Sequence, residues 1–207
     1  MCLPPRCRVH ITSRPAGISR TMSFKAWKRC LICCMSILSG VAAINVYGAS
    51  PADKEAQVKT AFIYNFTKFI DWPASEPGSE ITVFSVCVLK PNPFGAALES
   101  FEHHQVRGRP VKTRLIDEEA EIPGCQVLFI RDAGLQALPG VLKKCQQSKT
   151  LTISDSPGFA KIGGMIQFVT RENKIRFEIN AEAAQEAGLK VSSQLLKLAQ
   201  RIHGGKP

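Results

Sequence analysis

The stretch Ile81-Thr-Val-Phe-Ser-Val-Cys-Val-Leu89 decides the fold class, because its residues are mostly apolar and β-branched. This profile is typical of a strand that is buried on both faces, as in parallel sheets. Two helix-like segments follow, Phe94–Phe101 and Leu135–Gln147, the second with a start near Pro139. Strands that alternate with helices predict a mostly parallel sheet flanked by helices, in a single α/β domain. The other strands expected in this part are Val111–Ile116, Gln126–Ile130 and Leu151–Ser154.

The pattern changes toward the C-terminus. Met165–Thr170 and Lys174–Ile179 flank the polar tripeptide Arg171-Glu172-Asn173, which predicts a C-terminal antiparallel hairpin. Asn180 can cap a helix that ends at Ala187, where Gly188 supplies the stop. Ser192 or Ser193 is expected to cap a last helix that runs to Ile202.

Before the first strand, apolar residues recur at a spacing of four, which predicts an amphipathic helix over residues 53–70. Asp71-Trp72-Pro73 ends this helix, because proline disfavours helical geometry in the residue before it. The apolar positions are Val58, Phe62, Phe66 and Ile70.

Residues 1–49 resemble a leader. An apolar run over residues 30–47 follows Lys25, Lys28 and Arg29 and ends in small residues, which is the pattern of a secretory signal. The alternative, a membrane anchor, needs about 20 apolar residues, whereas the apolar core is shorter and is interrupted by Asn45. We therefore expect an exported protein, with a leader at 1–49 (Met22 would start one of ordinary length) and a mature domain at 50–207.

The formal net charge of +10 comes largely from this leader, which carries seven of the 27 Lys and Arg residues and no Asp or Glu. The remaining 20 basic residues face 17 acidic ones, a balance of about +3. So small an excess argues against nucleic acid as a partner.

Three of the eight cysteines lie outside the leader: Cys87, Cys125 and Cys145. An oxidising compartment permits one bridge and leaves one thiol unpaired. Cys87 and Cys125 fall in or beside central strands, whose spacing of about 5 Å suits a disulfide. The alternative is a pair of buried, reduced cysteines.

No group of residues indicates catalysis, a metal or a cofactor. A nucleophile would need an activating histidine, but His103 and His104 fall in a polar loop and His203 in a C-terminal tail. Adjacent side chains such as His103 and His104 also diverge, which disfavours a metal site. Residues 158–164 are glycine-rich but lack the spacing of a phosphate loop, so a tight turn is favoured.

The hairpin carries the most suggestive polar face. Arg176 and Glu178 alternate with Phe177, so the two charged side chains share one face of their strand. A solvated face is the usual meaning of mixed charges, and a docking surface is the alternative.

Several blocks of sequence together resemble the YfiR-like periplasmic proteins. The first is Lys59-Thr-Ala-Phe-Ile-Tyr-Asn-Phe-Thr-Lys-Phe-Ile-Asp-Trp-Pro73, which is similar to the opening helix of that family. The likeness spans roughly residues 55–202. The later blocks are Val88–Gly95, Cys125–Ile130, Leu151–Ala160, Gly163–Phe168, Lys174–Asn180 and Gly188–Ala199.

The resemblance implies a non-enzymatic periplasmic α/β domain, often a homodimer. It also implies an inner-membrane partner, a diguanylate cyclase that is held inactive through its periplasmic sensor region. The family's disulfide maps onto Cys87 and Cys125, and its partner-facing carboxylate maps onto Glu178. A second bridge of some members has no counterpart, since its positions fall near Ala160 and Gln167.

We therefore expect the partner to be contacted by Glu178, Arg176 and the loop from Asp155 to Phe159. The other functional class left open is a small-ligand-binding module, with its pocket formed by the loops after the parallel strands.

Overall fold

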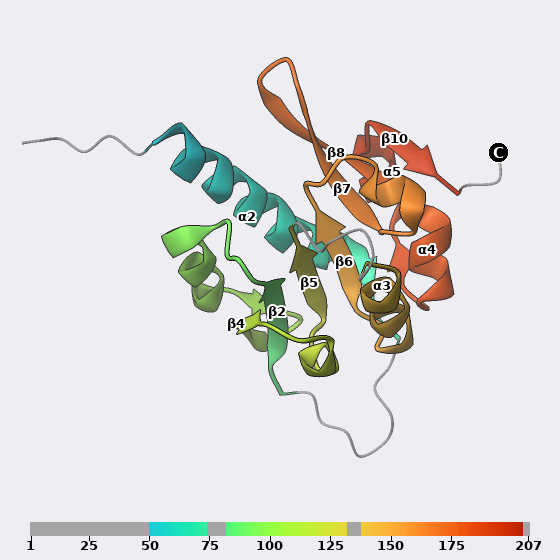
Figure 1. The fold of residues 1–207 in the computed structure, drawn as a ribbon, viewed down its shortest axis with the longest axis horizontal. Helices are drawn as coiled ribbons and strands as arrows, with labels where there is room; N and C mark the ends of the chain where they lie inside the picture. The colour runs from blue at the N-terminus through green and yellow to red at the C-terminus, as the bar shows by residue number, and fades with distance from the viewer. Residues whose placement is uncertain (1–49, 74–81, 132–137, 205–207) are drawn as a thin grey trace, which may run out of the picture. The chain divides into compact units, whose positions relative to one another are not determined.

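The computed structural model describes residues 50–73, 82–131 and 138–204, which form one compact unit (Figure 1). The predicted leader lies outside these residues. Within the described ranges, no helix combines the length and the apolar character that a bilayer crossing requires.

The domain is built on an eight-stranded sheet with the order β10-β8-β7-β6-β5-β2-β4-β3. The run from β4 through β2, β5 and β6 to β7 is parallel, whereas β8 is antiparallel to β7 and β3 is antiparallel to β4. The predicted α/β class, with a mostly parallel sheet and a C-terminal hairpin, is therefore confirmed. The strands are β2 (Phe84–Leu89), β3 (Gln105–Val106), β4 (Arg109–Ile116), β5 (Val127–Ile130), β6 (Leu151–Ser154), β7 (Ile166–Arg171), β8 (Lys174–Asn180) and β10 (Arg201–His203).

Helix α2 (Pro51–Phe69) opens the described chain. The hydroxyl of Ser50 accepts the backbone N–H of Asp53, and the carboxylate of Asp53 accepts the N–H of Ser50, so a capping box fixes the start of the helix. Its apolar side packs on the hairpin, where the rings of Phe66 and Phe177 lie 4.9 Å apart.

Two apolar clusters are formed by alternating side chains of the central strands. In β2, Val86 and Val88 belong to the cluster that includes α2, whereas Cys87 belongs to the second cluster. The second cluster includes Val141 of α3. This alternation explains why the central strands read as continuous apolar runs. The shorter helical segments are α3 (Leu138–Gln147), α4 (Ala181–Glu186), α5 (Ser193–Leu198), η1 (Gly95–His103), η2 (Glu119–Glu121) and η3 (Phe159–Ile162).

The C-terminal part differs from the sequence prediction. The last helix, α5, ends at Leu198 rather than Ile202, because Ala199 is extended and the N–H of Gln200 donates to the carbonyl of Phe177. The chain then adds β10, which pairs in parallel with β8. His203 is consequently part of the sheet and not of a loose tail.

A second, two-stranded sheet was not predicted either. It pairs β1 (Ile70–Asp71) with β9 (Lys190–Val191) in antiparallel fashion directly after α2. By contrast, Asn180 caps α4 as expected, by accepting the N–H of Ala183.

Candidate functional site

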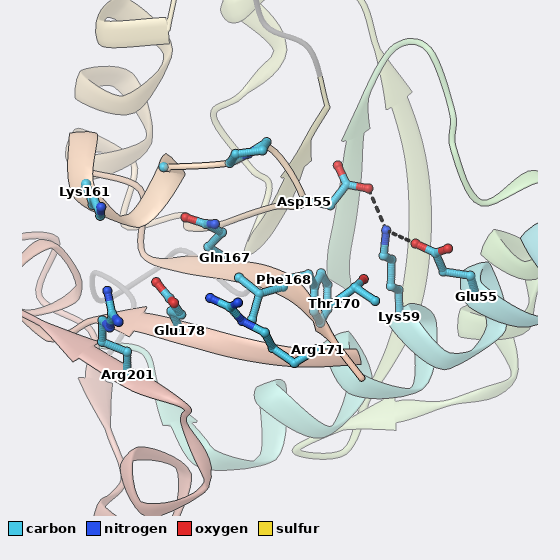
Figure 2. Close-up of a pocket in the computed structure, with 13 residues that line it drawn as sticks. Glu55, Lys59, Asp155, Lys161, Gln167, Phe168, Thr170, Arg171, Glu178 and Arg201 are labelled. Carbon is cyan, nitrogen blue, oxygen red and sulfur yellow. Dashed lines mark hydrogen bonds and ion pairs between the residues drawn. The ribbon is translucent and has the colours of Figure 1, made fainter. Parts of the chain in front are cut away.

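A polar pocket of about 460 Å³ lies where α2, the loop after β6, the hairpin β7–β8 and β10 meet. Figure 2 shows an ionic group at one end, around Lys59, and charged side chains from η3, β7, β8 and β10 at the other. Its lining residues are Glu55, Lys59, Asp155, Pro157, Gly158, Lys161, Gln167, Phe168, Val169, Thr170, Arg171, Glu178 and Arg201.

Lys59 forms the centre of the first end. Its ammonium lies 2.7 Å from Oε1 of Glu55 and 2.7 Å from Oδ2 of Asp155, while only 10% of its side chain is exposed. Arg131 adds a weaker contact to Asp155, at 3.9 Å. A lysine this buried needs such partners, because burial penalises an uncompensated charge. The contact joins α2 to the loop that follows β6.

The other end is one face of the hairpin and β10. Gln167 is paired with Glu178 in register, Val169 with Arg176, and Glu178 with Arg201. Residues paired across a sheet project to the same face, so these side chains share it. Phe168 and Phe177 form the opposite pair and lie toward α2.

Glu178 is held by a histidine. Its Oε2 lies 2.7 Å from Nε2 of His203, and the two side chains are 10% and 17% exposed. The parallel pairing of β10 with β8 brings this histidine over the carboxylate. Glu178 is therefore a nearly buried residue of the pocket floor.

Gln167 is also buried, with 6% of the residue exposed. Its Oε1 accepts the backbone N–H of Ala160 at 3.1 Å. The two positions at which some family members were expected to carry a second bridge are thus neighbours here and are joined by a hydrogen bond.

The structure brings together most of the predicted contact residues. Asp155 and Glu178 line the pocket, and Arg176 is exposed on the same sheet face. Phe159 is a correction: it is 1% exposed and packs in the second apolar cluster, so a partner cannot reach its side chain in this conformation. Gly164 lies so close to this ring that an added Cβ would overlap it.

Sequence reasoning missed the roles of Lys59, Arg201 and His203. Lys59 follows Glu55 by four residues, a spacing that is typical of an exposed helical ion pair. Arg201 and His203 were assigned to a helix end and a tail. Only the pairing of β10 with β8 places Arg201 at the pocket and His203 against Glu178.

Away from the pocket, the structure contains a disulfide between Cys87 and Cys125, the expected pair, with Cα atoms 5.8 Å apart. Cys145 is free and buried in the same apolar cluster. Burial, with a smaller contribution from Glu119, raises the pKa of its thiol to about 12. This thiol is therefore protonated and unreactive at neutral pH.

The described residues contain no group of three or more His, Cys, Asp or Glu placed to hold a metal. The glycine-rich segment at 158–164 forms a turn, with Gly158 and Gly163 at φ values of +81° and +101°. Ser154 is fully buried and its hydroxyl accepts the N–H of Ser156. What the arrangement offers chemically is charged and hydrogen-bonding groups for binding.

Comparison with known proteins gives one family match. Residues 56–200 match the model of a protein family, DUF4154, that is described as YfiR/HmsC-like.

Two solved structures are also similar. One is the ABC domain in complex with L-Trp from Streptococcus pneumonia, at 15% identity and a TM-score of 0.46. The other is a conserved domain protein from Vibrio cholerae, at 11% identity and a TM-score of 0.44. The matches cover 71% and 74% of this chain and 60% of each of those chains.

Proposed function

This chain belongs to the YfiR/HmsC-like family, and from that membership we propose that it is a periplasmic regulator that binds and represses a membrane-bound diguanylate cyclase. Repression would lower cyclic di-GMP and with it biofilm formation. The proposal includes export by a cleaved leader and a homodimeric state.

The observation that carries the proposal is the family match, which extends over residues 56–200 and so over nearly all of the mature domain. The pocket agrees with a binding role. It presents charged side chains from α2, η3, β7, β8, β10 and the loop after β6, and its buried groups are fixed by ion pairs and hydrogen bonds. A preorganised surface of this kind loses little entropy when a partner docks.

Regulation would arise from a difference in affinity. A protein that binds one conformation of the cyclase more tightly than the other shifts the cyclase toward the bound conformation. A tenfold preference corresponds to about 1.4 kcal/mol. In this proposal the contact region consists of Arg176, Glu178 and the loop that begins at Asp155. Arg176 is the exposed contact, and Glu178 shapes the floor of the pocket.

The test is the level of cyclic di-GMP in cells that lack the gene. We expect a rise over the parent strain that is reversed by the wild-type chain but not by a matched chain lacking residues 1–49. Complementation with Arg176→Glu should reverse the rise less completely, because the substitution inverts an exposed charge at the proposed contact. An unchanged level, with the protein detected in the parent's periplasm, would exclude the repressor role.

The second candidate function is that of a small-ligand-binding module, which the pocket of about 460 Å³ favours by its size. The test is calorimetry of the purified protein with small molecules isolated from periplasmic extract, without any membrane protein. Saturable binding of one of them would support this function over the first.

A further inference from the structure

We propose that the hairpin face binds an acidic peptide segment of a protein partner, with one carboxylate of that segment held in the pocket beside Gln167. The inference rests on the proposed function in so far as the partner is the membrane protein. It adds the chemistry by which that partner is recognised.

The first observation is an excess of positive charge without internal partners. Five exposed cationic residues lie on the hairpin face or at the pocket, and we call them the cationic face. None of the five forms an ion pair with any residue in the ranges that the structure describes. They are Lys161, Arg171, Lys174, Arg176 and Arg201.

The carboxylates nearby do not balance this charge. Glu178 is the single acidic residue on the paired strands, and its Oε2 is engaged by His203. Glu172 lies in the hairpin turn. At the other end of the pocket, Glu55 and Asp155 are already paired with Lys59. Like charges gathered on one face produce a positive potential that attracts an anionic partner.

The second observation is the amide of Gln167. Its oxygen is fixed by the N–H of Ala160, and its NH₂ group has no acceptor among the described residues. The side chain lines the pocket although the residue is 94% buried (100 − 6). No buried side-chain nitrogen or oxygen among the described residues lacks a partner, so this NH₂ group is open to the pocket and can donate to an acceptor on a bound molecule. A carboxylate oxygen is such an acceptor.

Figure 2 shows that Lys161, Arg171 and Arg201 surround Gln167 and Glu178 at this end of the pocket. A guanidinium can bind a carboxylate through two parallel hydrogen bonds, which suits the two arginines. Arg176 and Lys174 continue the same face beyond the pocket and would contact further acidic residues of the segment.

The pocket favours a peptide over a membrane surface. Gln167 is almost fully buried, so an anion must enter the hollow to reach its NH₂ group. A side chain on a peptide can do so, whereas the plane of lipid headgroups meets only the exposed rim. The two sources of anionic charge can therefore be separated by experiment.

The test measures binding to protein purified from the periplasm. The probes are a fluorescent tetraglutamate peptide and its tetraglutamine counterpart, followed by anisotropy at low salt and at 1 M salt. We expect the glutamate peptide to bind at least about tenfold more tightly, and to lose this advantage at 1 M salt, where the Debye length falls to about 3 Å.

The double variant Arg171→Gln, Arg201→Gln should weaken tetraglutamate binding about tenfold. The free energy of two exposed ion pairs together is close to the free-energy difference that changes an affinity tenfold. The double variant Lys143→Gln, Lys190→Gln, at exposed positions of α3 and β9 away from the pocket, is the charge-matched control and should bind as the wild type does. Thermal melts of all three proteins establish that the fold is retained, as expected for exposed positions.

Equal affinity for the two peptides, or tetraglutamate binding that is unaffected by the double variant, would overturn the inference. So would binding to phosphatidylglycerol vesicles that is lost in the double variant while the peptide fails to bind. Because this assay contains no cyclase, selective peptide binding with unchanged cellular cyclic di-GMP would sink the repressor role alone. Equal binding of the two peptides, together with a rise of cyclic di-GMP in cells lacking the gene, would overturn the inference alone.

Discussion

Breaking the bridge between Cys87 and Cys125 should cost the domain about 4 kcal/mol of its free energy of unfolding. The bridge closes a loop with a sequence separation of 38 residues. In the chain-entropy model this removes about 13 cal/mol/K from the unfolded ensemble, which is about 4 kcal/mol at 25 °C. For a domain of this size the loss corresponds to a fall in melting temperature of roughly 8 to 16 °C.

The assay compares urea unfolding of the oxidised protein with that of protein unfolded and refolded in dithiothreitol. Both half-cystines are buried, at 0% and 2% exposed, so the native protein should resist reduction and the reductant must be added to the unfolded chain. A Cys145→Ala background removes the free thiol and prevents exchange. A difference below about 1 kcal/mol between the two forms would refute the entropic argument.

Three further predictions concern single residues. Lys59→Met leaves the 15%-exposed carboxylate of Asp155 without its main partner and should cost about 3 kcal/mol in urea unfolding; a loss under about 1 kcal/mol would mean that the pair contributes little. Gly164→Ala places a methyl group against the buried ring of Phe159 and should cost about 3 kcal/mol, whereas an unchanged urea midpoint would contradict the packing described. Burial raises the pKa of the Cys145 thiol to about 12 from an ordinary 9.0, so the unfolded chain loses this proton first as the pH rises. The thiol's contribution to stability is therefore complete below pH 9 and lost between about pH 9 and 12, and at pH 8 the native thiol should react with Ellman's reagent only after denaturation.

Local sequence patterns predicted most of the sheet. The strand at Leu151–Ser154 has its expected bounds, and the hairpin and its turn are displaced by no more than about a residue. These segments are apolar or alternating over four residues or more, so their burial is visible in the sequence. Asn180 was likewise recognisable as a cap, because its side chain acts on a neighbour three residues away.

Three of the strands that were missed are formed by distant contacts, whereas β3 pairs locally with β4. Ile70–Asp71, Lys190–Val191 and Arg201–His203 are strands of two or three residues, too short to show a period. Their extended geometry depends on the strand that each one pairs with. The pocket could not be predicted for the same reason, because it depends on residues that are far apart in the sequence. Lys59 and Asp155 are 96 residues apart, and neither carries a local signal of their contact.

The packing of α2 on the hairpin also sets a schedule for folding. Phe177 follows Phe66 by 111 residues (177 − 66), so the helix is synthesised long before the ring that covers it. At a rate of about 5 to 20 residues per second, the interval is roughly 6 to 22 s. In the proposed exported protein folding waits for translocation, so the apolar stripe of the helix stays uncovered for at least this interval, and a chaperone that shields it would raise the yield of folded protein.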